Sequence, residues 1–266
     1  MNESLVKYLA GLLDADGSLS FDSHRGYDEN VRISLKLHLT AADTIDRDGF
    51  VASLPELTGF GNVNNYNGKY TQWSVCHRNE LEMLVPRLIK HMYVKPQHWQ
   101  WLMDYWREHR SQEKGQKWLS EAEWQKLSEA SKESRRTRVG PVKPKNHPSW
   151  AWLAGFLDGD GCFSFRTSRN HNMRLSVTAH VSDLPVLEFL QNAFGGTIRN
   201  NSRSDDIKVW WRGLGPSHES FVLDFLPRLV KHSRFKRHKI EQMIHFYNHR
   251  RQQRLSASTP TGDAIV

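Results

Sequence analysis

One ten-residue motif occurs twice in this chain. Residues 9–18 read LAGLLDADGS and residues 153–162 read LAGFLDGDGC, and seven of the first nine positions are identical. The similarity continues beyond the motif, since LVPRLIKHMYVK at 84–95 matches FLPRLVKHSRFK at 225–236. The separation of matched residues drifts slowly, as small changes in loop length would make it. The chain therefore consists of two copies of one unit of roughly 110 residues.

Each copy starts with the same predicted elements. The motif is predicted to be a helix, ended by Gly17 or Gly161 in a left-handed cap conformation. Apolar and polar residues then alternate at 31–39 and 174–181, which indicates strands with one buried and one exposed face.

The rest of the unit completes an α+β fold. A hairpin is predicted at 62–75 around an Asn-Gly turn, and apolar spacing at 80–88 and 99–106 predicts two further helices. The expected order is α-β-β-α-β-β-α, with a four-stranded antiparallel sheet backed by helices in each unit.

Composition between and beyond the units predicts a linker and a tail. Ser120 and Glu123 form a capping box for a charged helix that reaches about Ser134, and a basic, Pro-rich stretch follows it. The expected domains are an N-terminal unit at 1–110, a linker at 111–148, a C-terminal unit at 149–255 and a disordered tail at 256–266.

Charge and cysteine content narrow the class of protein. The net charge of +8 favours a polyanionic partner, but residues 1–110 are net acidic, so any nucleic-acid contact there needs cations sorted onto one face. Two cysteines exclude a disulfide framework. No apolar run is long enough to cross a membrane and no signal peptide is evident, so the expected location is the cytoplasm, the nucleoid or an organelle interior such as a mitochondrion or chloroplast.

The first half of the motif has a structural explanation. Gly11 and Gly155 fall in the middle of the predicted helices, where glycine costs about 1 kcal/mol relative to alanine. Small residues let two helix backbones approach closely. The two motif helices are therefore predicted to pack on each other at the centre of a pseudo-twofold.

The acidic half of the motif needs another explanation. Asp14, Asp16, Asp158 and Asp160 fall at helix C-termini, where each anion is disfavoured by about 0.3–1 kcal/mol. A positive group is therefore expected there, and Mg²⁺ fits because it takes one or two carboxylates together with substrate phosphates. For Asp14 and Asp158 a local hydrogen-bonding role is an equal alternative.

Both motifs resemble the signature of the LAGLIDADG homing endonucleases, in the single-chain form that carries two motifs. The resemblance covers about residues 3–110 and 147–250. It implies a monomer that needs no protein partner and cuts both strands of double-stranded DNA across the minor groove, leaving short 3′ overhangs. In this family the last acid of each motif and the preceding carbonyl hold the divalent metal, Mg²⁺ or another such as Mn²⁺. Here these are Asp16 with Ala15, and Asp160 with Gly159.

The exposed faces of the predicted strands are the expected DNA-binding surface. Arg suits guanine, Asn suits adenine and Lys suits the backbone. The candidates are Arg32, Ser34, Lys36, His38, Thr40, Asn62, Asn64, Tyr66 and Lys69 in the first unit, and Arg166, Ser168, Arg174, Ser176, Thr178, His180, Arg199, Asn201, Arg203, Lys208, Trp210 and Arg212 in the second.

Matched lysines are the remaining catalytic candidates. Family members often carry a basic residue near the metal, and Lys95 and Lys236 occupy matched positions; Lys90 and Lys231 are the rival pair. Two alternative functions use the same scaffold, namely an RNA maturase that assists splicing and a non-catalytic DNA-binding protein. Retention of Asp16 and Asp160 favours the nuclease.

Overall fold

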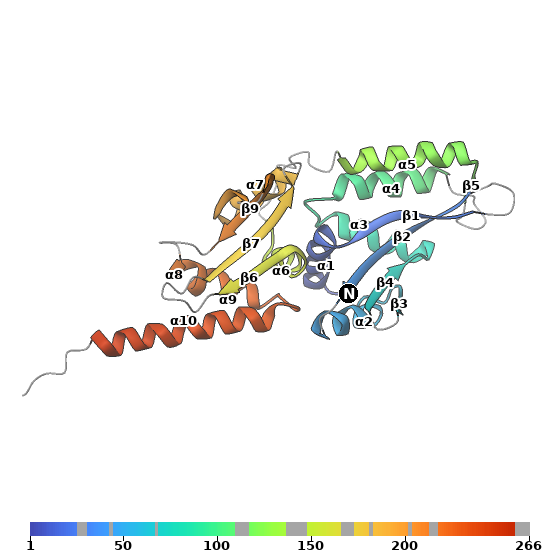
Figure 1. Ribbon diagram of the computed structural model, residues 1–266. Helices are drawn as coiled ribbons and strands as arrows, with labels where there is room; N and C mark the ends of the chain where they lie inside the picture. Colours follow the sequence, from blue (N-terminus) through green and yellow to red (C-terminus); the bar gives the residue numbers. More distant parts are fainter. Residues whose placement is uncertain are drawn as a thin grey trace, which may run out of the picture.

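The computed structural model describes residues 1–25, 31–42, 45–66, 69–109, 117–136, 148–165, 173–180, 183–201, 204–212 and 218–258. The first motif starts a series of elements that reaches the end of the linker helix (Figure 1). They are α1 (Glu3–Ala15), β1 (Ser18–Arg25), β2 (Val31–Ala42), α2 (Ile45–Thr58), β3 (Asn62–Tyr66), β4 (Tyr70–Val75), α3 (Arg78–Ile89), α4 (Pro96–His109), β5 (Lys117–Leu119) and α5 (Glu121–Arg136).

The second motif starts a matching series. It comprises α6 (Trp150–Asp160), β6 (Gly161–Phe165), β7 (Met173–His180), α7 (Leu184–Phe194), β8 (Thr197–Asn201), β9 (Ser204–Arg212), α8 (His218–Ser220), a π-helical turn η4 (Phe221–Phe225), α9 (Leu226–Val230) and α10 (Arg237–Ser258). The α+β class and the duplicated order of elements are confirmed.

Each unit has an antiparallel sheet with the same strand order. The first sheet runs β1-β2-β4-β3 and the second runs β6-β7-β9-β8. On β2, Leu35, Leu37 and Leu39 are buried against the helices, so the alternation seen in the sequence does sort this strand into an inner and an outer face.

The linker adds structure that the sequence pattern did not predict. The short strand β5 pairs with β2, with Leu119 opposite Val31, and makes the first sheet five-stranded. The predicted capping box is present, because the backbone N–H of Ser120 donates to Glu123 at 2.8 Å and the N–H of Glu123 donates back to the Ser120 hydroxyl at 3.3 Å. Part of the linker thus belongs to the first sheet and its covering helices.

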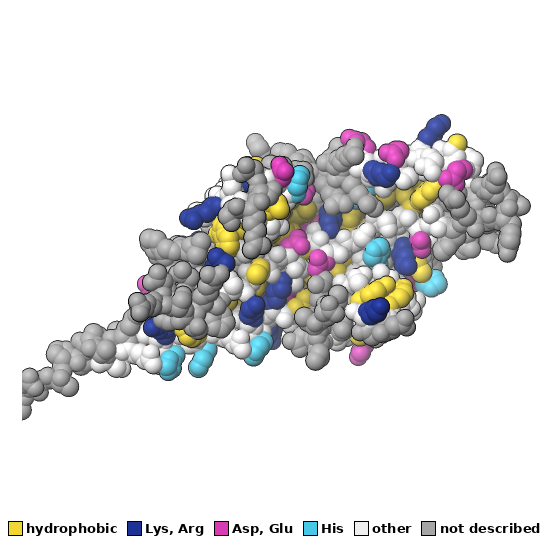
Figure 2. Space-filling view, in the orientation of Figure 1, with side chains coloured by type: hydrophobic (Ala, Val, Ile, Leu, Met, Phe, Trp, Pro, Cys, Tyr) yellow, Lys and Arg dark blue, Asp and Glu magenta, His cyan; other side chains and the backbone are white. Residues whose placement is uncertain are grey.

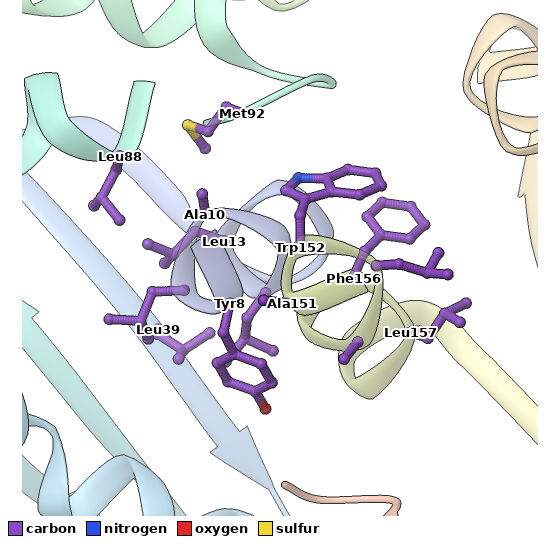
Figure 3. Close-up of a cluster of buried hydrophobic side chains, with 14 of the residues drawn as sticks. Tyr8, Ala10, Leu13, Leu39, Leu88, Met92, Ala151, Trp152, Phe156 and Leu157 are labelled. Carbon is purple, nitrogen blue, oxygen red and sulfur yellow. The ribbon is translucent and has the colours of Figure 1, made fainter. Parts of the chain in front are cut away.

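The motif helices α1 and α6 pack against each other between the two sheets (Figures 1 and 3). A Cβ atom added to Gly11 would collide with the carbonyl of Trp152, and one added to Gly155 would collide with the carbonyl of Tyr8. Each glycine therefore gives its space to the main chain of the other helix. The predicted central helix pair is confirmed, and its closeness depends on these two positions.

Two local expectations were wrong. Gly17 and Gly161 are not left-handed caps: neither is among the positive-φ glycines of the described chain, and Gly161 has φ −75°. Each instead packs on its own helix, since an added Cβ would lie 2.6 Å from the Cα of Leu13 or from the carbonyl oxygen of Leu157. Helix α10 also runs to Ser258, into the stretch expected to be a disordered tail.

Two further observations concern cysteines and membranes. Cys76 and Cys162 are unpaired thiols exposed at the surface. Among the described residues, no helix is both long and apolar enough to cross a membrane.

Candidate functional site

Asp16 and Asp160 stand at the adjoining C-terminal ends of the motif helices. Both side chains are exposed, Asp16 as the residue that caps α1 and Asp160 as the last residue of α6. A Cβ on Gly159 would lie 3.1 Å from a carboxylate oxygen of Asp16. The carboxylate of Asp16 therefore lies across the helix interface, against the residue that precedes Asp160.

The two motifs differ at the residue between their acids, and packing explains the difference. A Cβ on Gly159 would come within 2.5 Å of the Cβ of Ala15. The interface therefore has room for one methyl group at this level, and Ala15 supplies it.

The matched lysines Lys95 and Lys236 hold the ends of the motif helices. Lys95 is buried, and its Nζ donates to the carbonyls of Leu13, Ala15 and Gly17 at 3.0, 3.0 and 2.9 Å. Such an ammonium offsets the negative end of the helix dipole.

The second unit repeats this arrangement. Lys236 Nζ donates to the carbonyls of Leu157, Gly159 and Gly161 at 2.8, 3.0 and 2.5 Å. Lys90 and Lys231, the rival pair, are exposed. The protein therefore supplies part of the positive charge that the motif was expected to attract, and the carbonyls of Ala15 and Gly159 already accept from these lysines.

Asp14 is a buried structural group. Its carboxylate accepts from the backbone N–H groups of Tyr93, Val94 and Lys95 at 2.8, 3.3 and 2.9 Å, and from the indole N–H of Trp152 at 2.9 Å. Burial raises the pKa of the Asp14 carboxyl above its ordinary value, and the surrounding N–H donors offset part of this increase.

Asp158 has the equivalent role in the second unit. It accepts from the backbone N–H groups of residues 234–236 and from the Ser233 hydroxyl at 2.6 Å. It also accepts from the hydroxyl of Tyr8 at 2.7 Å. Of the two roles left open for Asp14 and Asp158, hydrogen bonding is therefore the observed one, although the partners are distant in sequence.

A reciprocal cross-brace thus joins the two units. Tyr8 and Trp152 occupy the same motif-relative position, and each reaches the first acid of the other motif. The two rings leave the helix pair on opposite sides (Figure 3). Sequence reasoning missed this pair, although two amphipathic rings at matched positions, 144 residues apart, were a signal for it.

The outer face of the first sheet carries most of the predicted side chains. Ser34, Lys36, His38 and Thr40 are half-buried on it, while Asn62, Asn64, Tyr66 and Lys69 are exposed. For Arg32 only the backbone pairing is described. The face also includes Gln72, which was not predicted and which donates to the Thr40 hydroxyl at 3.2 Å.

The second sheet differs from the prediction on β9. Trp210 is fully buried and its indole N–H donates to the Gly195 carbonyl at 2.9 Å. Arg212, two residues on, has its guanidinium 5.7 Å from the ring of Phe225, and burial lowers its pKa. The prediction therefore placed Trp210 and Arg212 on the wrong face of β9. Lys208, two residues before Trp210, lies on the same side of the strand as these two residues.

Trp211 takes the outer position instead. The guanidinium of Arg174 lies 4.5 Å from the Trp211 ring centroid, and its Nε donates to Ser164 at 3.1 Å. Ser176 was predicted to be exposed, but it is buried on β7, between β6 and β9.

The remaining candidates divide between exposed, half-buried and undescribed positions. Thr178, His180 and Arg199 are exposed, and Asn201 is half-buried. Arg166, Ser168 and Arg203 lie outside the described residues.

The donor set at the motif ends fits a hard divalent cation. Among the described residues, no group of three or more His, Cys, Asp or Glu side chains could hold a metal alone. Two exposed carboxylates do suit Mg²⁺, which keeps several waters and shares its coordination with substrate phosphates. A carbonyl oxygen has two lone pairs. The carbonyls of Ala15 and Gly159, which each accept a hydrogen bond from a lysine, can therefore still donate a lone pair to a metal ion.

This duplicated fold, with acids at the foot of a central helix pair, is that of the two-motif LAGLIDADG proteins. A model of the LAGLIDADG endonuclease family matches residues 153–228. The match covers the second unit, and the first unit carries the same motif, so both units resemble this family.

Individual relatives agree with the family. The chain is 37% identical over 57 residues to the probable intron-encoded endonuclease aI2 of Debaryomyces hansenii, a match that covers 21% of this chain and 8% of that protein. The LAGLIDADG homing endonuclease I-GzeII in complex with its DNA target has a similar fold, with a TM-score of 0.68 at 15% identity, over 96% of this chain and 93% of that one. I-SmaMI bound to cleaved DNA gives a TM-score of 0.68 at 16% identity, over 98% and 93% of the two chains.

Proposed function

We propose that this protein is a site-specific endonuclease that binds a long double-stranded DNA target and cuts both strands across the minor groove. The main support is the pair of exposed acids, Asp16 and Asp160, at adjoining helix ends between two sheets with polar outer faces. The relatives support the same reading, because I-GzeII and I-SmaMI are described as bound to DNA. The minor groove is only about 6 Å wide, so adjoining acids suit a cut on each strand.

The cofactor in this proposal is Mg²⁺ or another divalent cation such as Mn²⁺. I-SmaMI has been seen with uncleaved DNA in the presence of calcium ions. Asp16 and Asp160 would hold the metal, with the carbonyls of Ala15 and Gly159 as neighbouring donors. When bound, such a cation polarises a phosphate and lowers the pKa of a bound water.

The protein's own groups prepare this site. Lys95 and Lys236 fix the last turns of the motif helices, so the two acids keep their positions. Their ammonium charges also reduce repulsion between the acids and a phosphate backbone. The outer faces of the two sheets would contact the duplex on either side of the cut. Cleavage of the two strands would leave short 3′ overhangs.

The test uses Asp16→Asn and Asp160→Asn, after a target has been selected from a randomised duplex library. Each single variant is expected to nick one strand or to stop cutting, the double variant to cut neither strand, and all three to bind the target. EDTA should abolish cleavage by the wild type. Asp104→Asn, which removes an exposed acid from α4, is the control and should cut normally. Wild-type cleavage by both single variants would disprove the assignment.

A further inference from the structure

The two units differ at one pair of matched loops. In the first unit, Tyr93 fills the space beside the helix pair: its ring stacks on Phe189 at 5.2 Å and meets Trp152 edge-on at 5.0 Å. The second unit has Arg234 at the position of Tyr93, and Arg237 at the position of Pro96. At these two matched positions an aromatic ring and a proline of the first unit are thus replaced by cations in the second.

A cavity of about 330 Å³ lies on the cationic side. Its lining consists of Ser4, Tyr8, Lys231, His232, Arg234 and Arg237. Three of these six side chains, Lys231, Arg234 and Arg237, are cationic and none is acidic, while burial lowers the pKa of His232. The two hydroxyl-bearing residues come from α1, residues 231, 232 and 234 come from the loop before α10, and Arg237 is the first residue of α10, so both units contribute to the cavity.

The surroundings strengthen the positive charge of this cavity. Arg237 is the first residue of the 22-residue helix α10, so the positive end of that helix dipole lies beside the cavity. Lys and Arg side chains gather over the start of α10 in Figure 2. The nearby acid, Asp158, is buried and accepts hydrogen bonds from Tyr8 and from the backbone of the loop.

The α1 side of the cavity lies away from the acidic end of that helix. Ser4 and Tyr8 precede Asp16 by twelve and eight residues on the same helix, which places them about 18 and about 12 Å away along the helix axis. The part of the cavity that α1 lines therefore lies on the flank of the helix pair, away from Asp16.

We infer that this cavity is a phosphate-binding site that joins the two units. Arginine and lysine bind phosphate oxygens through charge-assisted hydrogen bonds, and hydroxyl groups add neutral ones. The guanidinium of Arg234 is already held over the rings of Tyr8 and Phe50 at 5.4 and 5.1 Å, so it is positioned in advance. The phosphate belongs either to a free anion or to a nucleic-acid backbone that continues along the basic helix α10.

The test needs neither metal nor target DNA, so its outcome is independent of the proposed cleavage. The melting temperature of the full chain is measured against inorganic phosphate, with chloride keeping the ionic strength constant. A ligand that binds the folded state raises Tm saturably. Lys231→Gln and Arg237→Gln should each weaken this response about tenfold or more, whereas Lys90→Gln, the matched position in the first unit, should retain it.

A second ligand identifies the source of the phosphate. The dinucleotide TpT has one phosphodiester and no terminal phosphate. Saturable binding of TpT that is lost in Lys231→Gln indicates a backbone site, and binding of inorganic phosphate alone indicates a free-anion site. An equal Tm rise with chloride, or a full phosphate response in both cavity variants, would overturn the inference. Lys231 is exposed, so its substitution tests binding without disturbing the core.

Discussion

At the scale of single residues, Lys95 and Lys236 explain how a helix can end in two acids. An ammonium that accepts nothing and donates to three carbonyls places a full positive charge where the helix dipole is most negative. The cost of an anion at this end is thereby reduced before any ligand arrives. The lysines are thus positioning residues of the motif as well as neighbours of its acids.

Replacing Lys95 tests this role. Lys95→Met preserves the length of the side chain but removes the ammonium group, which leaves three carbonyls without their donor. The free energy of unfolding should therefore fall by about 2–4 kcal/mol. Urea denaturation measures the loss. Lys90→Met alters an exposed lysine nearby and should change stability by less than about 0.5 kcal/mol. Equal stabilities for the two variants would show that the carbonyls need no cation.

At the scale of elements, the central helix pair depends on two glycines that lie against opposing carbonyls. Neither glycine has a positive φ in the described chain, so conformational freedom is not the reason for glycine here. The reason is the space taken by the main chain of the neighbouring helix.

Glycine-to-alanine changes should therefore have opposite effects at different sites. Gly11→Ala forces α1 and α6 apart, and the free energy of unfolding should fall by about 1–3 kcal/mol or more. Gly49→Ala, in α2, meets no atom within 4 Å and should raise it by up to about 1 kcal/mol. Thermal or urea unfolding of both variants measures the contrast. A stabilising effect at Gly11 would contradict the packing described above.

Sequence patterns predicted the elements better than their faces. The duplication, the helix pair and the order of strands follow from periodicity, because these features repeat over many residues. The face of β9 does not, because Val209, Trp210 and Trp211 are apolar in succession and either parity is plausible. Hydrogen bonding decides it: Trp210 donates to the Gly195 carbonyl, just as Trp73 donates to that of Phe60.

The site shows the same division. The acids at the motif ends could be chosen from sequence, because a repeated charge at a helix C-terminus is electrostatically unusual. The partners of Asp14 and Asp158 could not, since they come from loops about 80 residues away and from the other unit. Such contacts are set by tertiary packing, and no local pattern encodes them.

At the scale of the whole molecule, several histidines link stability to pH. Burial lowers the pKa of His38, His91 and His232 below the ordinary value of 6.5. For His91 burial outweighs the favourable effect of Glu3, which lies 2.8 Å away but is itself largely exposed. The unfolded chain therefore binds more protons than the folded chain near pH 6.

This linkage predicts a loss of stability in mild acid. The histidine contribution is fully present above pH 6.5 and is lost as the pH falls through the lowered folded-state pKa values. Urea midpoints between pH 7.5 and 5.5 measure it, and His38→Gln combined with His232→Gln should flatten the decline. Stability that rises on acidification over this window would contradict the prediction. Asp14 has the opposite effect. Its pKa in the folded state is raised above the ordinary value of 3.8, so its contribution to stability increases as the pH falls.

The cross-brace of Tyr8 and Trp152 also bears on how such a chain can be rebuilt. Each unit donates a side-chain hydrogen bond to the buried carboxylate of the other unit, so neither unit alone supplies all the donors of its own buried acid. A chimera that joins this N-terminal half to the C-terminal half of a relative would need matching donors at these two positions, while the outer faces of its sheets could be exchanged without regard to one another. The two halves of a chimera must therefore match at the interface between α1 and α6, whereas the outer faces of their sheets need not match.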